Sequence, residues 1–115
     1  PALLRWAAAV GRCYLAEPFP AGPAVPAMDA GMGLGLLADL YDVTGEDSWL
    51  NGGLSRADEL IAIYFGDADL PAGASGIDWY ESQMGPSFLL HGLARIALLA
   101  RDGRPCILPP DYTAR

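Results

Sequence analysis

Four apolar segments with helical spacing follow one another along this chain, and the connections between them alternate between long and short. Stretches rich in glycine and proline, residues 17–28 and 66–83, follow the first and third segments. Only Thr44-Gly45-Glu46 separates the second segment from the third. Helical hairpins packed side by side would place both long loops at one end and the tight turn at the other. Long loops on a packed scaffold often carry binding and catalysis, so that end is the expected functional face.

Residues that commonly begin or end helices set the expected bounds of the first two helices. Alanine-rich residues 2–16 form the first helix, and the prolines between positions 18 and 26 then exclude regular structure. Asp29 is an N-cap for a second helix over residues 30–43. Gly45 follows that helix at the position where glycine commonly ends one.

The third and fourth helices are bounded in the same way. Asp47 or Ser48 can cap the third helix, which runs to about residue 65. Its predicted core stripe comprises Leu50, Leu54, Ala57, Leu60, Ile61, Tyr64 and Phe65, with Arg56, Asp58 and Glu59 turned outward. The fourth helix starts at Pro86 and ends at Arg101, leaving an irregular tail over residues 104–115.

The four helices differ in kind. The first and third are amphipathic, whereas the second and fourth are apolar on nearly every side and therefore need neighbours on every side. The pattern predicts an all-α fold of two antiparallel helical hairpins in the order outer, inner, outer, inner. Gly31, Gly33 and Gly35 are interpreted as helix-packing positions in the second helix, because no strand precedes them as a dinucleotide site requires.

Charge and length narrow the classes of function. The chain has 115 residues, which fits a single unit, and a net charge of −7, which argues against nucleic acid or an anionic membrane as a partner. No stretch is apolar enough to span a bilayer and no signal peptide is evident, so we expect a soluble, cytoplasmic protein. Acidic groups near a loop would suit a neutral polyol or a cation.

Residues 77–83 are chemically the richest segment. Asp78, Trp79, Tyr80, Glu81 and Gln83 supply two carboxylates, two aromatic rings and an amide just before the fourth helix. Sugar hydrolysis uses two carboxyl groups, and aromatic faces stack on sugar rings while polar groups set orientation. The alternatives are that the rings anchor the loop to the core and that the carboxylates are solvated or cap a helix.

The hairpin around the tight turn resembles a known family. The stretch LLADLYDVTGEDSWL, residues 36–50, with RADEL at residues 56–60, resembles a hairpin of the α/α-toroid proteins, which include the six-hairpin glycosidases and related sugar epimerases. Residues 78–101 fit a second inner helix with its lead-in. The chain departs from the family in spanning only two hairpins. It could belong to a larger toroid, pack with further copies of itself, or close as an ordinary four-helix bundle, and the first is the favoured interpretation.

The resemblance implies a function. It suggests part of a carbohydrate-active, glycoside hydrolase-like enzyme that forms one wall of a sugar-binding cleft. The residues themselves offer no cofactor or metal motif, so neither is expected. It also places Asp29 at the loop end, so that Asp29 with Asp78 or Glu81 could form an acid/base pair. The alternative is a non-catalytic helical module that binds a partner or supports a larger fold, in which Asp29 is only an N-cap.

The one histidine and the two cysteines give less information about function. His91 is the only histidine and is interpreted as a satisfied core residue, since the related epimerases are expected to use a histidine pair. Cys13 and Cys106 could form a disulfide that joins the two ends of the chain, but two unpaired thiols are the favoured interpretation.

Overall fold

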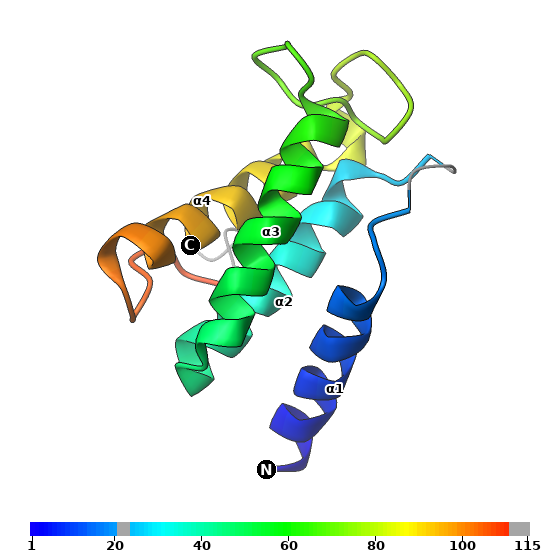
Figure 1. The fold of residues 1–115 in the computed structure, drawn as a ribbon. Coiled ribbons are helices and arrows are strands. Elements are labelled where there is room, and N and C mark those ends of the chain that lie inside the picture. Colours follow the sequence, from blue (N-terminus) through cyan, green and yellow to red (C-terminus); the bar gives the residue numbers. More distant parts are fainter. Residues whose placement is uncertain (21–23, 111–115) are drawn as a thin grey trace.

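The computed structural model describes residues 1–20 and 24–110, and within them the fold is all-α as predicted (Figure 1). The helices are α1 (Ala2–Ala16), α2 (Ala27–Thr44), α3 (Asp47–Tyr64) and α4 (Pro86–Asp102), with a single 3-10 turn, η1 (Ser82–Met84), before α4. The only β-type pairing among these residues is an isolated bridge between Pro26 and Ala74.

The two long loops lie at one end of the molecule, as the alternating connections predicted (Figure 1). They also bond to each other: Ala27 N–H donates to Gly73 O at 2.8 Å, and Ser75 N–H donates to Val25 O at 2.9 Å. The Ser75 hydroxyl in turn accepts from Val25 N–H at 2.8 Å. The loops therefore form one connected platform, and we call this end of the molecule the loop end.

Two helix starts differ from the prediction. α2 begins at Ala27 after Pro26, so Asp29 lies in its first turn and is not the N-cap. Pro26 is the N-cap residue and has the extended ψ of 143° that such a residue adopts, and a carboxylate in the first turn is stabilised by the helix dipole without capping. α3 likewise follows Glu46, which makes no side-chain capping bond, and Asp47 is in its first turn.

The glycine and proline signals were accurate. Gly45 has a φ of +70° and its N–H donates to Tyr41 O at 2.7 Å, which ends α2 at the predicted turn. Pro86 is in the first turn of α4, and Gly103, with a φ of +80°, follows the end of that helix one residue later than predicted.

α2 is the central helix, and it contacts the other three. α2 and α4 cross at backbone distance because glycine faces the partner on both sides. A Cβ on Gly31 would collide with the backbone of Phe88 and Leu89, and one on Gly92 would lie 2.8 Å from Gly31 O. Gly33 faces the ring of Tyr14 on α1, so these two of the three α2 glycines are packing positions, whereas Gly35 faces open space.

The predicted inner and outer roles are only partly observed. α2 is inner, but α4 exposes Leu90 and Ala97 to solvent. The stripe predicted for α3 is displaced, because Leu54 and Ile61 are more than a third exposed. The buried positions of α3 recur three or four residues apart and are Trp49, Gly53, Arg56, Ala57, Leu60 and Tyr64.

Arg56 was predicted to face outward, and that prediction was wrong. Its guanidinium is buried and donates to Tyr14 O at 2.9 Å and to Glu17 O at 2.6 Å, the carbonyls at the C-terminal end of α1. It also lies 4.4 Å from the centre of the Tyr14 ring. α1 has no basic residue in its last turn, so a cation from α3 satisfies these carbonyls instead.

Candidate functional site

A cavity of about 520 Å³ lies at the loop end, between the C-terminal turn of α3 and the loop that follows it. Three of the predicted site residues, Asp78, Trp79 and Tyr80, line this cavity. The remaining lining residues come from the end of α3 and from the loop: Ile63, Tyr64, Phe65, Gly66, Asp67, Ala68, Asp69, Leu70, Ala72 and Ile77. Tyr64, Asp67 and Asp69 were not among the predicted site residues.

The two aromatic rings are available to a ligand. Trp79 is 59 % exposed and Tyr80 is 47 % exposed, so neither ring anchors the loop to the core. The backbone beneath them is fixed, because Gly73 N–H donates to Trp79 O at 3.1 Å. Exposed rings on a fixed backbone provide flat apolar surface at low cost in conformational entropy.

All charged side chains that line the cavity are acidic. Asp67, Asp69 and Asp78 contribute three carboxylates, and no lysine, arginine or histidine is among the lining residues. Such a surface repels anionic ligands and accepts hydrogen bonds from hydroxyl or ammonium groups. The cavity therefore suits a neutral polyhydroxylated or a cationic ligand.

Glu81, Gln83 and Asp29 do not line this cavity. Glu81 Oε1 accepts from Gln83 N–H at 3.0 Å and caps η1, and its Cβ packs against Gly73. Asp29 is exposed in the first turn of α2. The carboxylates that share the cavity with Asp78 are thus Asp67 and Asp69.

Tyr64 links the cavity wall to the other long loop. Its ring is buried, and its hydroxyl donates to Val25 O at 2.8 Å. Burial raises the pKa of Tyr64 to about 12, with the charge of Asp29 adding in the same direction. The phenol therefore stays neutral and holds residues 24–26 against the end of α3. A tyrosine in the last turn of an amphipathic helix gives no sequence signal for this role.

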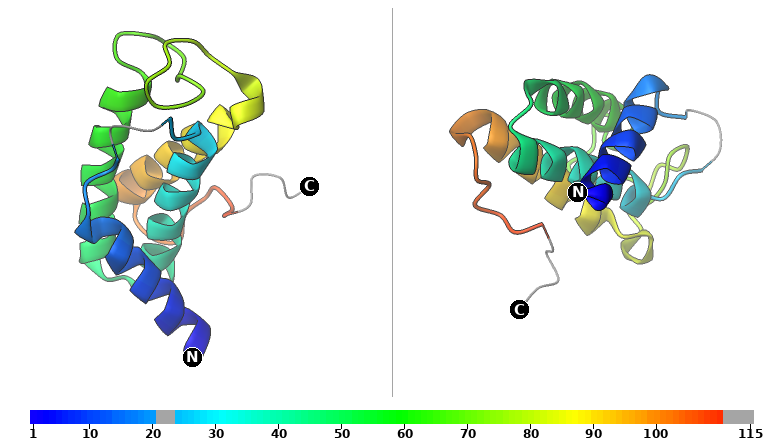
Figure 2. Two further views of the ribbon diagram at one scale, coloured as in Figure 1. Left: turned by 90° about the vertical axis from the view of Figure 1, so that its right-hand side faces the viewer. Right: turned by 90° about the horizontal axis from the view of Figure 1, so that it is seen from below.

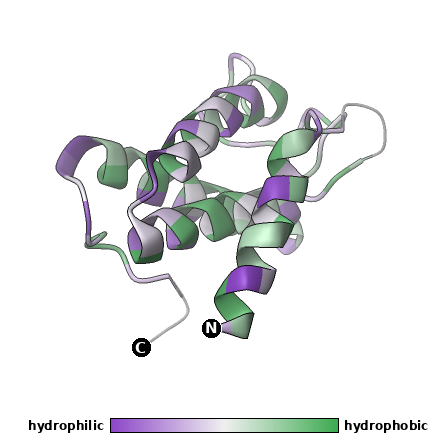
Figure 3. Ribbon diagram, turned by 60° about the horizontal axis from the view of Figure 1, so that its bottom comes forward, coloured by the Kyte–Doolittle hydropathy of each residue, from purple (hydrophilic) through white to green (hydrophobic). Residues whose placement is uncertain are grey.

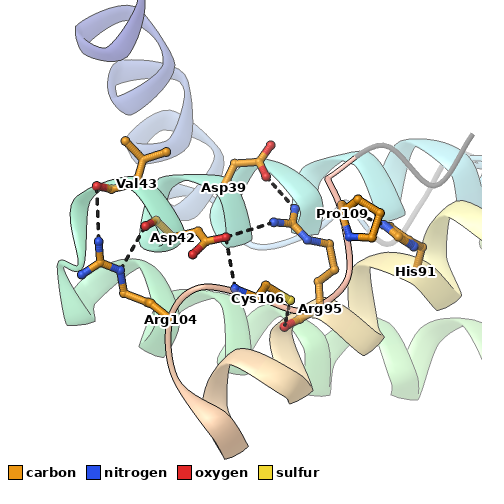
Figure 4. Close-up of polar contacts among 8 residues, drawn as sticks. All are labelled: Asp39, Asp42, Val43, His91, Arg95, Arg104, Cys106 and Pro109. Atoms are coloured by element: carbon orange, nitrogen blue, oxygen red, sulfur yellow. Dashed lines mark hydrogen bonds and ion pairs between the residues drawn. The ribbon is translucent and has the colours of Figure 1, made fainter. Parts of the chain in front are cut away.

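A second polar cluster lies on the opposite side of α2 from α1, beneath the C-terminal tail (Figure 4). Arg95 of α4 is 1 % exposed, and its Nη1 lies 2.6 Å from Asp39 Oδ1 while its Nη2 lies 3.8 Å from Asp42 Oδ2. Arg95 was not predicted from the sequence, because α4 was expected to be apolar on nearly every side. Because both acids come from α2, the cluster fixes how α2 and α4 are placed along each other, which is a structural role.

The tail follows this cluster back along α2 and α4 (Figure 4). Arg104 donates to Asp42 O at 3.0 Å and so satisfies a carbonyl at the end of α2, and Cys106 N–H donates to Asp42 Oδ2 at 3.4 Å. His91 Nε2 lies 2.9 Å from Pro109 O. His91 is half-buried beside the tail, so the core position predicted for it was wrong; the predicted tail residues 111–115 lie outside the described part of the chain.

The structure also bears on the cysteines, on metal binding and on membrane-spanning helices. Cys13 and Cys106 are both free thiols. In the described residues, no three side chains of histidine, cysteine, aspartate or glutamate are grouped as a metal ion would require. No helix among them has the length and hydropathy to cross a bilayer.

Comparison of the chain with protein-family models, with curated proteins and with solved structures finds no match. The resemblance to α/α-toroid hairpins therefore stays a prediction from the sequence.

Proposed function

We propose that the loop end binds carbohydrate and forms one wall of a sugar-binding cleft in a glycoside hydrolase-like enzyme. The observation that carries the proposal is the placement of two exposed rings, Trp79 and Tyr80, beside three aspartates in one cavity of about 520 Å³. Sugars present apolar C–H faces to aromatic rings and hydroxyl donors to carboxylates, and this wall offers both kinds of group. The resemblance to toroid hairpins supports the same ligand class.

If the wall is catalytic, Asp78 is the strongest candidate acid or base. It lies next to Trp79 and shares the cavity with Asp67 and Asp69, whereas Glu81 is engaged in capping η1. A glycosidase needs two carboxyl groups that flank the scissile bond, one protonated and one ionised. The second would come from Asp67 or Asp69 across the loop, or from the facing wall of the cleft.

A non-catalytic scaffold is the second candidate. Two observations favour it: the capping role of Glu81, and the apolar side chains that α1 and α3 present to solvent, Leu3, Trp6 and Ile61 among them. A module in which Glu81 serves a helix end and whose helices expose apolar faces would support or join a larger fold. The two candidates differ in what happens at the cavity, so ligand binding separates them.

The binding test compares two tryptophans of similar exposure. Trp79 lies in the cavity, and Trp6, 65 % exposed, lies on α1 outside it. We expect glucose hexasaccharides, with either β-1,4 or α-1,4 linkages, to change tryptophan fluorescence on titration. Trp79→Ala should remove the response and weaken binding about tenfold or more, while Trp6→Ala should leave the affinity unchanged. Equal affinity in wild type and Trp79→Ala would reject the sugar site at this cavity.

A separate experiment tests whether Asp78 is catalytic. Asp78→Asn should lower glycoside hydrolysis by a factor of roughly 10² to 10⁴ if Asp78 transfers a proton. Glu81→Gln should stay active, because the amide oxygen of glutamine can still accept from Gln83 N–H. If Asp78→Asn still binds sugar and hydrolyses glycosides at the wild-type rate, the catalytic groups lie elsewhere. The cavity is then only a wall that binds sugar.

A further inference from the structure

The carboxylates of the loop-end cavity have no basic residue beside them. The chain contains no lysine, and none of the arginines that the structure describes lines the cavity. Arg12 lies beside Glu46 near the tight turn, and Arg95 is paired with Asp39. Figure 3 shows α1 as mainly hydrophobic with two separate hydrophilic bands, which fits its two arginines. The positive charge of this chain is thus used away from the cavity.

The end of α3 adds negative potential to the same cavity. A helix carries partial negative charge at its C-terminus, and a cation there is stabilising. Arg56 donates to carbonyls at the end of α1, Arg104 donates to one at the end of α2, and Arg101 is in the last turn of α4. α3 has no basic residue in its last turn, and that turn forms part of the cavity wall through Tyr64. The charge that the other helix ends receive from arginine is left for a ligand to supply.

The three carboxylates of the cavity are spread out. Asp67 and Asp69 are on the turn that follows α3, whereas Asp78 is beside Trp79 further along the loop, and all three are exposed. Over residues 1–20 and 24–110 no three acidic, histidine or cysteine side chains are grouped closely enough to hold a metal ion. Separated carboxylates match a ligand that carries several positive groups along its length. Each exposed ion pair contributes little, so a preference needs several of them.

The aromatic rings favour a cation that is carried on a sugar. The faces of Trp79 and Tyr80 can pack against the C–H groups of a sugar ring, and the same faces attract a nearby ammonium group. The loop that bears them stands clear of α1 and of the C-terminal end of α4, as Figure 1 and the left view of Figure 2 show. A chain of sugar units can therefore lie along the loop without meeting those helices.

We propose that the loop-end cavity prefers amino sugars, and specifically oligomers of β-1,4-linked glucosamine, over neutral sugars of the same linkage. This inference rests on the proposed function, because it assigns the ligand class of the same sugar site. The protonated amines pair with Asp67, Asp69 and Asp78 while the sugar rings stack on Trp79 and Tyr80. In a glucose oligomer a hydroxyl replaces each amine, and it can bond to a carboxylate but brings no charge. Oligomers of uronic acids are repelled by the same carboxylates.

The experiment compares glucosamine and glucose hexamers, both β-1,4-linked, by calorimetric titration of the whole chain. At about pH 5.5, where amines are protonated and aspartates are ordinarily ionised, the glucosamine hexamer should bind about tenfold or more tightly than the glucose hexamer. The preference should fall in about 0.5 M NaCl, which screens exposed charges. It should also fall at about pH 9, where free α-amino groups lose their proton, because the ligand then becomes neutral.

Two double variants of equal charge change locate the preference. Asp67→Asn with Asp69→Asn should reduce it to about threefold or less, since the amides keep acceptors but lose charge. Glu46→Gln with Asp47→Asn changes two exposed acids at the tight turn and should keep the full preference. Circular dichroism checks that both variants are folded.

The possible failures are distinguishable. If the glucose hexamer binds as tightly as the glucosamine hexamer, the amino-sugar preference is overturned and the sugar site stands. An equal loss of preference in both double variants also overturns it, because overall charge would then attract the ligand. If neither hexamer binds, the preference and the sugar site are both rejected.

Discussion

The clearest quantitative prediction compares alanine substitutions at two glycines one helical turn apart. Gly31 and Gly35 lie on the same helix, and both should cost helix stability by roughly 1 kcal/mol relative to alanine. Their surroundings are opposite. A Cβ at Gly35 has nothing within 4 Å, whereas one at Gly31 would collide with backbone atoms of Phe88 and Leu89.

The contacts of each glycine determine whether its replacement by alanine raises or lowers the free energy of unfolding. Gly35→Ala should raise the free energy of unfolding by about 0.5 to 1 kcal/mol, because only the helix propensity changes. Gly31→Ala gains the same propensity but forces α4 away from α2, since the colliding atoms are backbone and cannot rotate aside. Overpacking of this kind costs about 1–3 kcal/mol and at times more, so the net change should be destabilising. Gly33→Ala should lie between the two, because its Cβ meets the Tyr14 side chain, which can move.

Urea denaturation monitored by circular dichroism measures all three variants. A difference of about 1–3 kcal/mol between Gly35→Ala and Gly31→Ala is expected, at unchanged denaturant slope. If Gly31→Ala were as stable as Gly35→Ala, α2 and α4 would not approach at backbone distance, and the described packing of the central helix would be refuted.

Two further predictions concern buried polar groups. Replacing both Asp39 and Asp42 by alanine leaves the Arg95 guanidinium buried without a counterion and should destabilise the fold by about 3 kcal/mol. Adding Arg95→Met to that double variant removes the unpaired charge and should recover part of the lost stability. Urea denaturation measures both variants. The raised pKa of Tyr64, about 12 against its usual 10, means that the unfolded chain loses this proton first as the pH rises. Stability should therefore fall between pH 10 and 12, and Tyr64→Phe should lessen that fall while losing about 1 kcal/mol at neutral pH with the bond to Val25. A fall of the same size in both proteins would contradict the assignment.

Sequence patterns predicted the four helices, and the placement of both long loops at one end, because those features depend on local chemistry and on the lengths of the connections. Gly45 and Pro86 act on their own backbone, so the turn and the start of α4 were placed correctly. The lengths of the connections fixed which loops share an end of the molecule. Asp29 was misplaced as an N-cap because Pro26 can start a helix three residues earlier.

The side chains that were missed depend on contacts between distant parts of the chain. Arg56 looks like a surface residue in its own helix, and only the position of the end of α1 makes it a buried donor. Arg95 lies within an apolar run, and its partners are more than fifty residues away on α2. Helical periodicity describes which face a residue occupies, but it cannot identify a carbonyl or a carboxylate supplied by another element.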